Sequence, residues 1–235
     1  MLNITNLHKS FNQKEILHGI TIHVEPGEIY GFIGHNGAGK TTTLKCVVGI
    51  LEYEEGTIRI DGMDLEKDPL VCKKKIAYLP DNPDLYDNLT GIQYLNFIAD
   101  IFGLSSEVRK ERIEMYAKEF EIYDHLGDQI KALSHGMKQK VAIISALIHE
   151  PQLLVLDEPF VGLDPKASFT LKNKMKEICE RGGSIFFSSH VLEVVENLCD
   201  HISIIKNGDI VIEGRTQDIV SSGQSLEEVF LSIEG

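Results

Sequence analysis

The sequence predicts an α/β fold: a largely parallel sheet, helices on both of its faces and a helical insertion in the middle third. Three observations predict it. The apolar run Ile29–Ile33 leads into a glycine-rich loop and then into helix-forming residues. A second apolar run, Leu153–Leu156, ends in two acids. Between these runs, residues 84–149 repeat their apolar side chains at helical spacing.

The N-terminal third alternates short strands with turns. Leu2–Leu7 and Ile20–Val24 have the pattern of half-buried strands, and we expect Phe11 to lie in a polar loop between them. The turn Glu25-Pro26-Gly27 then precedes the buried strand Ile29–Ile33. Two further strands are expected after the first helix: Thr57–Ile60, followed by the turn Asp61-Gly62, and Ile76–Leu79, closed by Pro80.

The middle third predicts helices, because its apolar residues form two groups at helical spacing. The groups are Ile92, Leu95, Ile98, Ala99 and Phe102, and Ile113, Tyr116, Ala117 and Phe120. We therefore expect a single domain over residues 1–235, with a core lobe of about 1–83 and 150–235 and a helical subdomain of about 84–149.

The last third returns to strands and helices. The expected strands are Leu153–Leu156, Ser184–Ser188 and Ile202–Ile205, and a helix is expected over Pro165–Glu180, where proline suits the first turn. Asn207-Gly208 predicts a tight hairpin that pairs Ile202–Ile205 with Ile210–Glu213. Thr216–Glu234 predicts one or two short helices.

The composition argues against several classes of protein. A formal net charge of −13 leaves no basic excess to neutralise nucleic-acid phosphates, so no nucleic-acid partner is expected. Four widely separated cysteines suggest neither a zinc site nor a disulfide framework. The N-terminus does not resemble a signal peptide, and no apolar stretch approaches the ~20 residues of a membrane span. We expect a cytoplasmic protein, which would reach a membrane only through a partner.

The glycine-rich loop, GHNGAGKTT, fits the pattern G-x-x-x-x-G-K-[ST]. Its backbone N–H groups would point into one concavity, where the dipole of the following helix also favours an anion. Lys40 would add a charge for the β- and γ-phosphates, and Thr41 a hydroxyl for Mg²⁺. A glycine-rich turn with a solvated lysine is the alternative, but the strand before the loop and the helix after it favour phosphate binding. The expected nucleotide-binding residues here are Gly34, His35, Asn36, Gly37, Ala38, Gly39, Lys40, Thr41 and Thr42.

Two acids and a histidine follow later strands. Asp157 ends Leu153–Leu156 and can hold the Mg²⁺ shell, while the adjacent Glu158 can orient or deprotonate a water that attacks the γ-phosphate. His190 follows the strand that begins at Ser184, at the same edge, where its imidazole can hydrogen-bond the γ-phosphate. Two solvated acids at a strand end are the ordinary alternative, which the phosphate loop in the same chain disfavours.

The segment LSHGMKQK, residues 133–140, opens a helix and has Ser134 as its expected N-cap. A helix N-terminus that carries a hydroxyl and a small residue, Gly136, is a second anion site without a lysine of its own. Alone, this segment is incomplete as an enzyme.

Together, these motifs resemble the nucleotide-binding domain of ABC transporters. GHNGAGKTT, LSHGMKQK, LLVLDEP, Val161–Pro165 and His190 stand in the order of the family's Walker A, signature, Walker B, D-loop and H-loop, and the resemblance spans residue 2 to about residue 213. It implies a P-loop NTPase core of mainly parallel sheet with an antiparallel β portion at the N-terminus.

The resemblance also implies ATP and Mg²⁺ as cofactors and a second nucleotide-binding subunit, identical or different. In that family, ATP lies between the Walker A loop of one subunit and the signature of the other, so Ser134 and Gly136 would contact the partner's ATP. Phe11 would stack on adenine, although the residues alone leave base stacking and core packing equally favoured. The catalytic residues would be Lys40, Glu158 and His190.

The implied function is ATP hydrolysis by a motor subunit on the inner face of the cell membrane. This subunit would drive transport through a separate transmembrane permease, which we expect to dock near Tyr86–Phe102. The alternatives are a soluble ABC-type ATPase, a nucleotide-gated regulator and a small-molecule kinase. A soluble ABC-type ATPase usually has long coiled coils or paired nucleotide domains, which this chain lacks. Glu158 and His190 disfavour a regulator that barely hydrolyses ATP, and the signature helix disfavours a kinase.

Three departures from the family pattern stand out. The signature LSHGM has His135 and Met137 where LSGGQ has glycine and glutamine. Asp81 stands where a glutamine is usual, and its oxygen could meet Mg²⁺ directly or through a water. The D-loop begins with Val161, where serine is common. Tyr30, Asp81 and GMKQK look more like bacterial exporters than importers.

Overall fold

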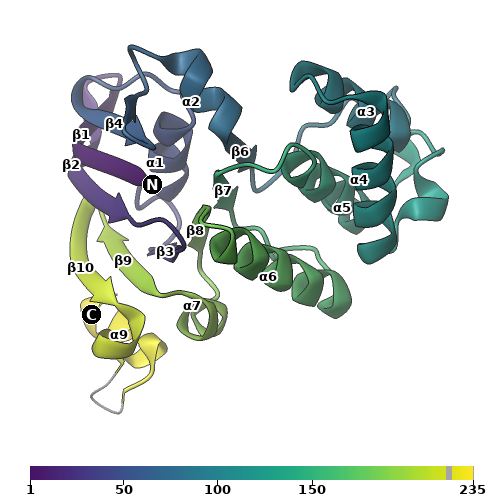
Figure 1. Cartoon of the computed structure of the whole chain (residues 1–235). Helices are drawn as coiled ribbons and strands as arrows, with labels where there is room; N and C mark the ends of the chain where they lie inside the picture. Colours follow the sequence, from purple (N-terminus) through teal and green to yellow (C-terminus); the bar gives the residue numbers. More distant parts are fainter. Residues whose placement is uncertain (221–223, 235) are drawn as a thin grey trace.

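A six-stranded sheet forms the centre of the molecule in the computed structural model, which describes residues 1–220 and 224–234 (Figure 1). All of its neighbouring strands are parallel except β9 and β10. In spatial order the strands are β10 (Asp209–Arg215), β9 (His201–Lys206), β3 (Ile29–Ile33), β8 (Ser184–Ser189), β7 (Leu153–Asp157) and β6 (Ile76–Leu79). The expected mainly parallel sheet is confirmed, and so is the Asn207-Gly208 hairpin, in which both residues have positive φ.

A second, antiparallel sheet forms the N-terminal portion, as expected. Its strands, in spatial order, are β2 (Lys14–Val24), β1 (Leu2–Phe11), β4 (Glu55–Ile60) and β5 (Met63–Asp64). The expected loop around Phe11 is wrong: β1 continues to Phe11, and only Asn12 and Gln13, with φ of 49° and 67°, separate it from β2. Asn tolerates this left-handed conformation, so a two-residue turn suffices.

The parallel sheet is covered on both faces. Along β3, Ile29 and Ile33 belong to one hydrophobic core, while Tyr30 and Phe32 belong to the other, as the alternation of a strand requires. The core around Tyr30 and Phe32 includes the antiparallel sheet and helix α1 (Lys40–Val47). The opposite core includes buried residues of α5 (His135–Leu147) and α6 (Pro165–Glu180).

Residues 84–149 contain three α-helices joined by loops and lie beside the β6–β7 edge (Figure 1). Helix α3 (Gly91–Ile101) begins at a capping box of Thr90 and Gln93, and α4 (Ser106–Glu119) begins at the N-cap Ser105. Most of the apolar residues expected to be core are buried: Leu95, Ala99, Ile113, Tyr116, Ala117 and Phe120. Their cluster continues into the sheet, and the division into a core lobe and a helical subdomain stays a prediction.

Several short elements complete the chain. Helices α2 (Pro69–Lys75) and α7 (Leu192–Leu198) were not expected from the sequence, whereas α8 (Thr216–Ile219) and α9 (Leu226–Glu234) are the two expected C-terminal helices. The 3-10 turns Tyr123–His125 and Ile130–Ala132 connect α4 to α5. Across residues 1–220 and 224–234, no helix is both long enough and apolar enough to cross a membrane.

Candidate functional site

The register of the parallel sheet gathers the predicted site residues at one edge. Strand β8 lies between β3 and β7, with Ser189 opposite Ile33 and Ser188 opposite Asp157. The carboxyl ends of the three strands therefore meet at the phosphate loop, the acids and His190. This is the edge at which open parallel sheets bind their ligands.

Glycine is required at particular points of the loop. Gly37 and Gly39 have φ of 84° and 116°, which a side chain would strain. Gly34 is needed for space, because a Cβ there would lie 2.5 Å from the carbonyl oxygen of Ile205. The chain can thus turn closely over the end of β3 before α1 begins at Lys40.

Lys40 folds back across the loop. Its ammonium donates hydrogen bonds to the carbonyl oxygens of Gly34 and His35 and lies 3.8 Å from a carboxylate oxygen of Glu158. Burial lowers the pKa of Lys40, and the charges of Glu158 and Asp157 oppose that shift. The ammonium therefore stands between the phosphate loop and the acidic strand end.

Asp157 is held by two hydroxyls. Thr41 Oγ1 donates to Asp157 Oδ2 at 2.7 Å, and Ser188 Oγ donates to the other carboxylate oxygen. Ser188 is a site residue that the sequence did not indicate, since its role depends on the β7–β8 register. The hydroxyl of Thr41 and the carboxylate of Asp157 give the set of hard oxygen atoms that suits a magnesium ion.

Glu158 has a left-handed backbone, with φ of 48°. Its N–H donates to the carbonyl oxygen of Ser188 at 3.1 Å, and its Oε2 lies 2.9 Å from His190 Nδ1 and accepts the His190 N–H at 3.1 Å. A left-handed non-glycine residue is costly and tends to occur at functional sites. The turn aims the carboxylate back toward Lys40 and His190.

Asp81 also reaches this edge. Burial raises its pKa, as do the charges of Asp157 and Glu158, while His190 and His135 act in the opposite direction. Nearby, the buried hydroxyl of Tyr78 has no hydrogen-bond partner among the residues that the structure describes, and burial raises its pKa, with further contributions from Asp157 and Asp81. Tyr78 is a second neighbour of the site that sequence reasoning did not identify.

Several of these groups line a cavity of about 170 Å³, whereas Ser188, His190 and Tyr78 lie outside its lining. It is lined by Ile16, His35, Asn36, Gly37, Gly39, Lys40, Thr41, Thr42, Asp81, Asp157 and Glu158. Sites for small organic ligands usually measure roughly 300–1,000 Å³. The cavity therefore suits phosphate groups but is too small to enclose a whole nucleotide.

The structure separates the other predicted residues from this cavity. Phe11 is 44% exposed at the tip of the β1–β2 hairpin. Ser134 caps α5 by accepting the N–H of Met137 at 3.3 Å. Gly136 lies against the D-loop, since a Cβ there would be 2.9 Å from the carbonyl oxygen of Gly162. Within this chain, the signature therefore contacts the D-loop rather than the phosphate loop.

Comparisons with known proteins agree with this geometry. Residues 17–161 match the domain family described as ABC transporter. The chain belongs to the ABC transporter family. It is 35% identical to the "ABC-type transporter ATP-binding protein EcsA" of Bacillus subtilis (strain 168), over 93% of this chain and 89% of EcsA. It is 34% identical to the "ABC transporter ATP-binding protein NatA" of the same strain, over 99% of this chain and 97% of NatA.

A solved "Structure of ATP binding subunit of ABC transporter" superimposes on the whole chain with a TM-score of 0.95, at 35% identity and full coverage of both chains. The ABC ATPase fold, a P-loop NTPase core, is thereby established for this chain, and ATP binding and hydrolysis are the activities of that domain.

The departures from the ABC signature have physical consequences here. The ring of His135 packs against Gly162, where a Cβ would lie 2.7 Å from the imidazole Cδ2. Met137 is partly buried against the large hydrophobic core. It therefore contributes to packing, whereas the usual glutamine offers an amide. Lys140 in turn pairs with Asp164 at 2.7 Å, which ties the signature helix to the start of α6.

Proposed function

We propose that this ABC subunit hydrolyses ATP between two nucleotide-binding subunits and thereby drives transport through a separate transmembrane permease. One observation carries the proposal. Lys40, Thr41, Asp157 and Glu158 line a cavity of a size that suits phosphates, whereas Ser134, the N-cap of α5, is not among the residues that line it. A second subunit, identical or different, would bring its Ser134 and Gly136 to this cavity and complete the site.

Each residue near the cavity has a distinct proposed role. The backbone N–H groups of the loop bind phosphate oxygens, and Lys40 leaves its carbonyl partners to bind the β- and γ-phosphates. Glu158 accepts the proton of the attacking water as general base. His190, whose imidazole holds the Glu158 carboxylate, would orient that carboxylate and contact the γ-phosphate. Bond cleavage then leaves ADP and inorganic phosphate.

Mg²⁺ fits the oxygen atoms beside the loop. Among residues 1–220 and 224–234, no three acidic, histidine or cysteine side chains are grouped closely enough to hold a metal alone. Mg²⁺ commonly takes one or two carboxylates together with waters and phosphate oxygens. We therefore assign Thr41 and Asp157 as its protein contacts, with Asp81 acting directly or through a water. Bound Mg²⁺ would neutralise charge on the β- and γ-phosphates.

Adenine would stack on Phe11. Ile16 lines the phosphate cavity, and Phe11 pairs with Lys14, two residues before Ile16 on β2. Two strand residues span roughly 7 Å, so the aromatic ring is within the reach of a base whose phosphates occupy the loop.

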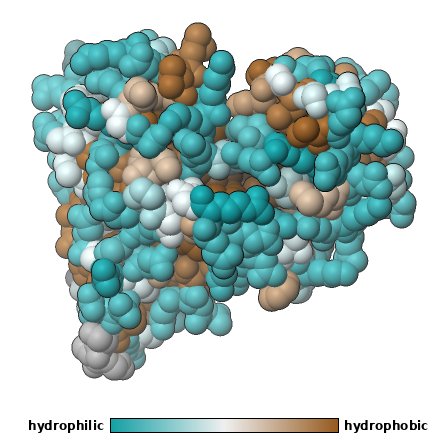
Figure 2. Space-filling view, in the orientation of Figure 1, coloured by the Kyte–Doolittle hydropathy of each residue, from teal (hydrophilic) through white to brown (hydrophobic). Residues whose placement is uncertain are grey.

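The permease would dock on the helical region. Tyr86, Phe97 and Ile101 are 56%, 42% and 61% exposed, and the Tyr86 and Phe97 rings pack edge to face at 5.7 Å. Brown, apolar surface is visible over this part of the molecule in Figure 2. Exposed aromatic and aliphatic residues that lie together in this way are consistent with a protein contact. The subunit would then work in the cytoplasm, peripheral to the inner face of the membrane; export as the direction stays a prediction.

The substitution Glu158→Gln tests the proposal. Without a general base, ATP is bound but not cleaved, so the variant should form an ATP-dependent dimer that elutes earlier on gel filtration. The matched control, Glu193→Gln, changes an exposed acid on α7 and should elute as the wild type does. A Glu158→Gln chain that stays monomeric with saturating ATP and Mg²⁺, with its permease present as well, would contradict the paired site.

A further inference from the structure

Lys9 is a buried lysine on β1 that has no role in the site described above. It is only 9% exposed, although a lysine normally keeps its ammonium in water. Its Nζ lies 2.6 Å from Glu54 Oε1 and 5.1 Å from the centroid of the Phe11 ring. The ammonium is therefore fixed between a carboxylate and the aromatic ring assigned to adenine.

Glu54 holds this arrangement from the segment before β4. Its second carboxylate oxygen accepts the N–H of Ser10 at 2.8 Å, and its own N–H donates to the carbonyl oxygen of His8 at 3.1 Å. The hydrogen bond from Lys9 lowers the pKa of Glu54, so the carboxylate stays charged. Glu54 thus accepts hydrogen bonds from the side chain of Lys9 and from the backbone of Ser10, the two residues that precede Phe11.

The consequence concerns the ring of Phe11. An aromatic side chain that is 44% exposed at a hairpin tip would otherwise exchange between rotamers. The Lys9 ammonium covers one face of the ring by a cation–π contact, which leaves the opposite face for a ligand. Fixing a binding group in advance reduces the entropy lost when the ligand binds.

We propose that Lys9 is a positioning residue for the nucleobase, which it serves by holding Phe11, together with Glu54, in the orientation that stacks on adenine. The inference rests on the proposed role of Phe11 in ATP binding. It predicts that Lys9 affects binding of the base and not binding of the phosphates.

The experiment measures how well two competitors displace a fluorescent ATP analogue that carries its label on the ribose. EDTA is present to prevent hydrolysis. ATP carries the base, whereas inorganic tripolyphosphate presents phosphates alone. In Lys9→Met, the dissociation constant for ATP should rise about two- to fivefold, the range expected for a cation–π contact whose aromatic ring is exposed. The dissociation constant for tripolyphosphate should stay unchanged. Lys9→Arg, which keeps the charge, should restore most of the affinity, and KM rather than kcat should carry the effect in turnover assays.

A matched control exists on α4. Lys118 lies 2.6 Å from Glu114 and 5.4 Å from the centroid of the Tyr123 ring, which is a similar cluster with a tyrosine ring and a more exposed lysine. Lys118→Met should bind ATP as the wild type does. Phe11→Ala and the double variant with Lys9→Met complete a cycle: Lys9→Met should have no further effect once the ring is gone.

The outcomes separate this inference from the proposed function. If Phe11→Ala binds ATP normally, the adenine assignment fails and the role of Lys9 fails with it. If Phe11→Ala weakens ATP but Lys9→Met does not, only the role of Lys9 fails. Equal weakening of ATP and tripolyphosphate in Lys9→Met would also overturn the inference, because it would mean general distortion. Should Lys9→Met fold poorly, Glu54→Gln is the second variant, with a smaller loss of ATP affinity expected.

Discussion

Glu158 shows how a single residue combines backbone and side-chain roles. Its left-handed φ turns the chain at the end of β7 so that one carboxylate meets both Lys40 and His190. The sequence predicted these three residues as catalytic from their motifs. It did not predict that His190 and Lys40 share this carboxylate, because their contact depends on strands far apart in the chain.

The hydrogen bond from Ser188 to Asp157 can be tested by a single substitution. Replacing Ser188 with alanine removes one of the two hydroxyls that hold Asp157, a carboxylate that is only 2% exposed. A hydrogen bond to a charged group contributes about 1.5–3 kcal/mol. We expect Ser188→Ala to lower kcat/KM for ATP by at least about tenfold, as a loss of about 1.4 kcal/mol would do. Steady-state phosphate release measures this.

The control for that test is Ser232→Ala, which removes from an exposed residue on α9 a hydroxyl that donates to the carbonyl oxygen of Val229 at 2.6 Å, and should leave turnover unchanged. Equal activity of Ser188→Ala and Ser232→Ala would mean that Thr41 alone orients Asp157. The sequence contained Ser188, but only the register between β7 and β8 shows its partner.

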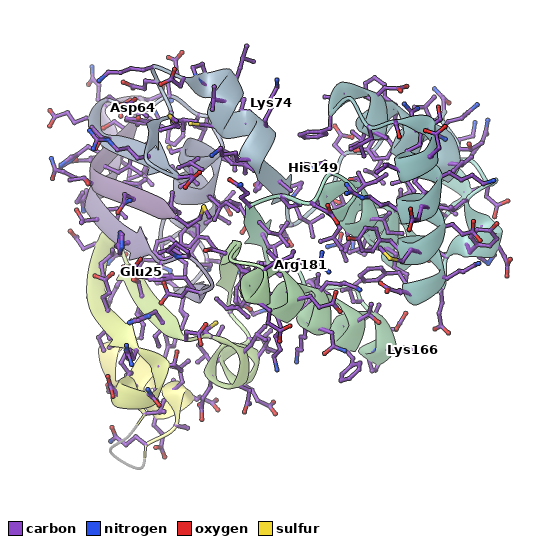
Figure 3. All side chains as sticks on the ribbon, in the orientation of Figure 1. Glu25, Asp64, Lys74, His149, Lys166 and Arg181 are labelled. Atoms are coloured by element: carbon purple, nitrogen blue, oxygen red, sulfur yellow. The ribbon has the colours of Figure 1, made fainter. Side chains whose placement is uncertain are left out.

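At the scale of elements, His149 joins three segments after the end of α5. Its ring stacks on Phe102 at 3.6 Å between centroids, and its Nε2 donates to the carbonyl oxygen of Ile76 at the start of β6. Figure 3 shows His149 where the sheet meets the helices. Its buried Nδ1 has no hydrogen-bond partner within residues 1–220 and 224–234, so a proton there would find no acceptor among them. Burial accordingly lowers the pKa of His149 to about 4.

This predicts a pH-dependent stability. The folded pKa of His149 lies below the unfolded value of 6.5, so the unfolded chain binds the extra proton between these values. The stabilisation is complete above pH 6.5 and is lost as the pH falls toward 4. From pH 7 to pH 5, we expect His149 to account for a loss of about 2 kcal/mol in the free energy of unfolding.

Urea unfolding at both pH values, on the wild type and on His149→Phe, measures this loss. The phenyl ring keeps the stacking and cannot be protonated, so the loss between pH 7 and pH 5 should shrink by that amount. An identical pH dependence in both proteins would assign the acid sensitivity to other groups.

Elements with strong periodicity were predictable, and short ones were not. The strands Ile29–Ile33 and Ile76–Leu79 and the helix Pro165–Glu180 have the predicted bounds, because apolar runs and a first-turn proline mark them. Helices α2 and α7 have seven residues each, too few for a clear 3.6-residue period. The sequence predicts a loop at Phe11 because a turn of only two residues, Asn12 and Gln13, leaves no clear signal of where β1 ends.

At the scale of the whole molecule, the incomplete cavity predicts that activity depends on concentration. If the signature of a second subunit must close the site, the purified chain should hydrolyse more ATP per molecule as its concentration rises. The rate of phosphate release, measured over a dilution series without the permease, should grow faster than linearly at low protein concentration and in proportion to concentration once most chains are paired. Constant activity per molecule across the series would show that one chain carries a complete site.

The contacts of Lys40 also bear on which anions the protein ignores. An incoming anion can bind the Lys40 ammonium only by displacing the carbonyl oxygens of Gly34 and His35 and by competing with the carboxylate of Glu158. A nucleoside triphosphate offsets the free energy lost with these contacts through several phosphate contacts and its base, whereas a single inorganic phosphate offsets little of it. We therefore expect free inorganic phosphate to inhibit the protein only weakly and the phosphate produced by hydrolysis to leave the loop readily.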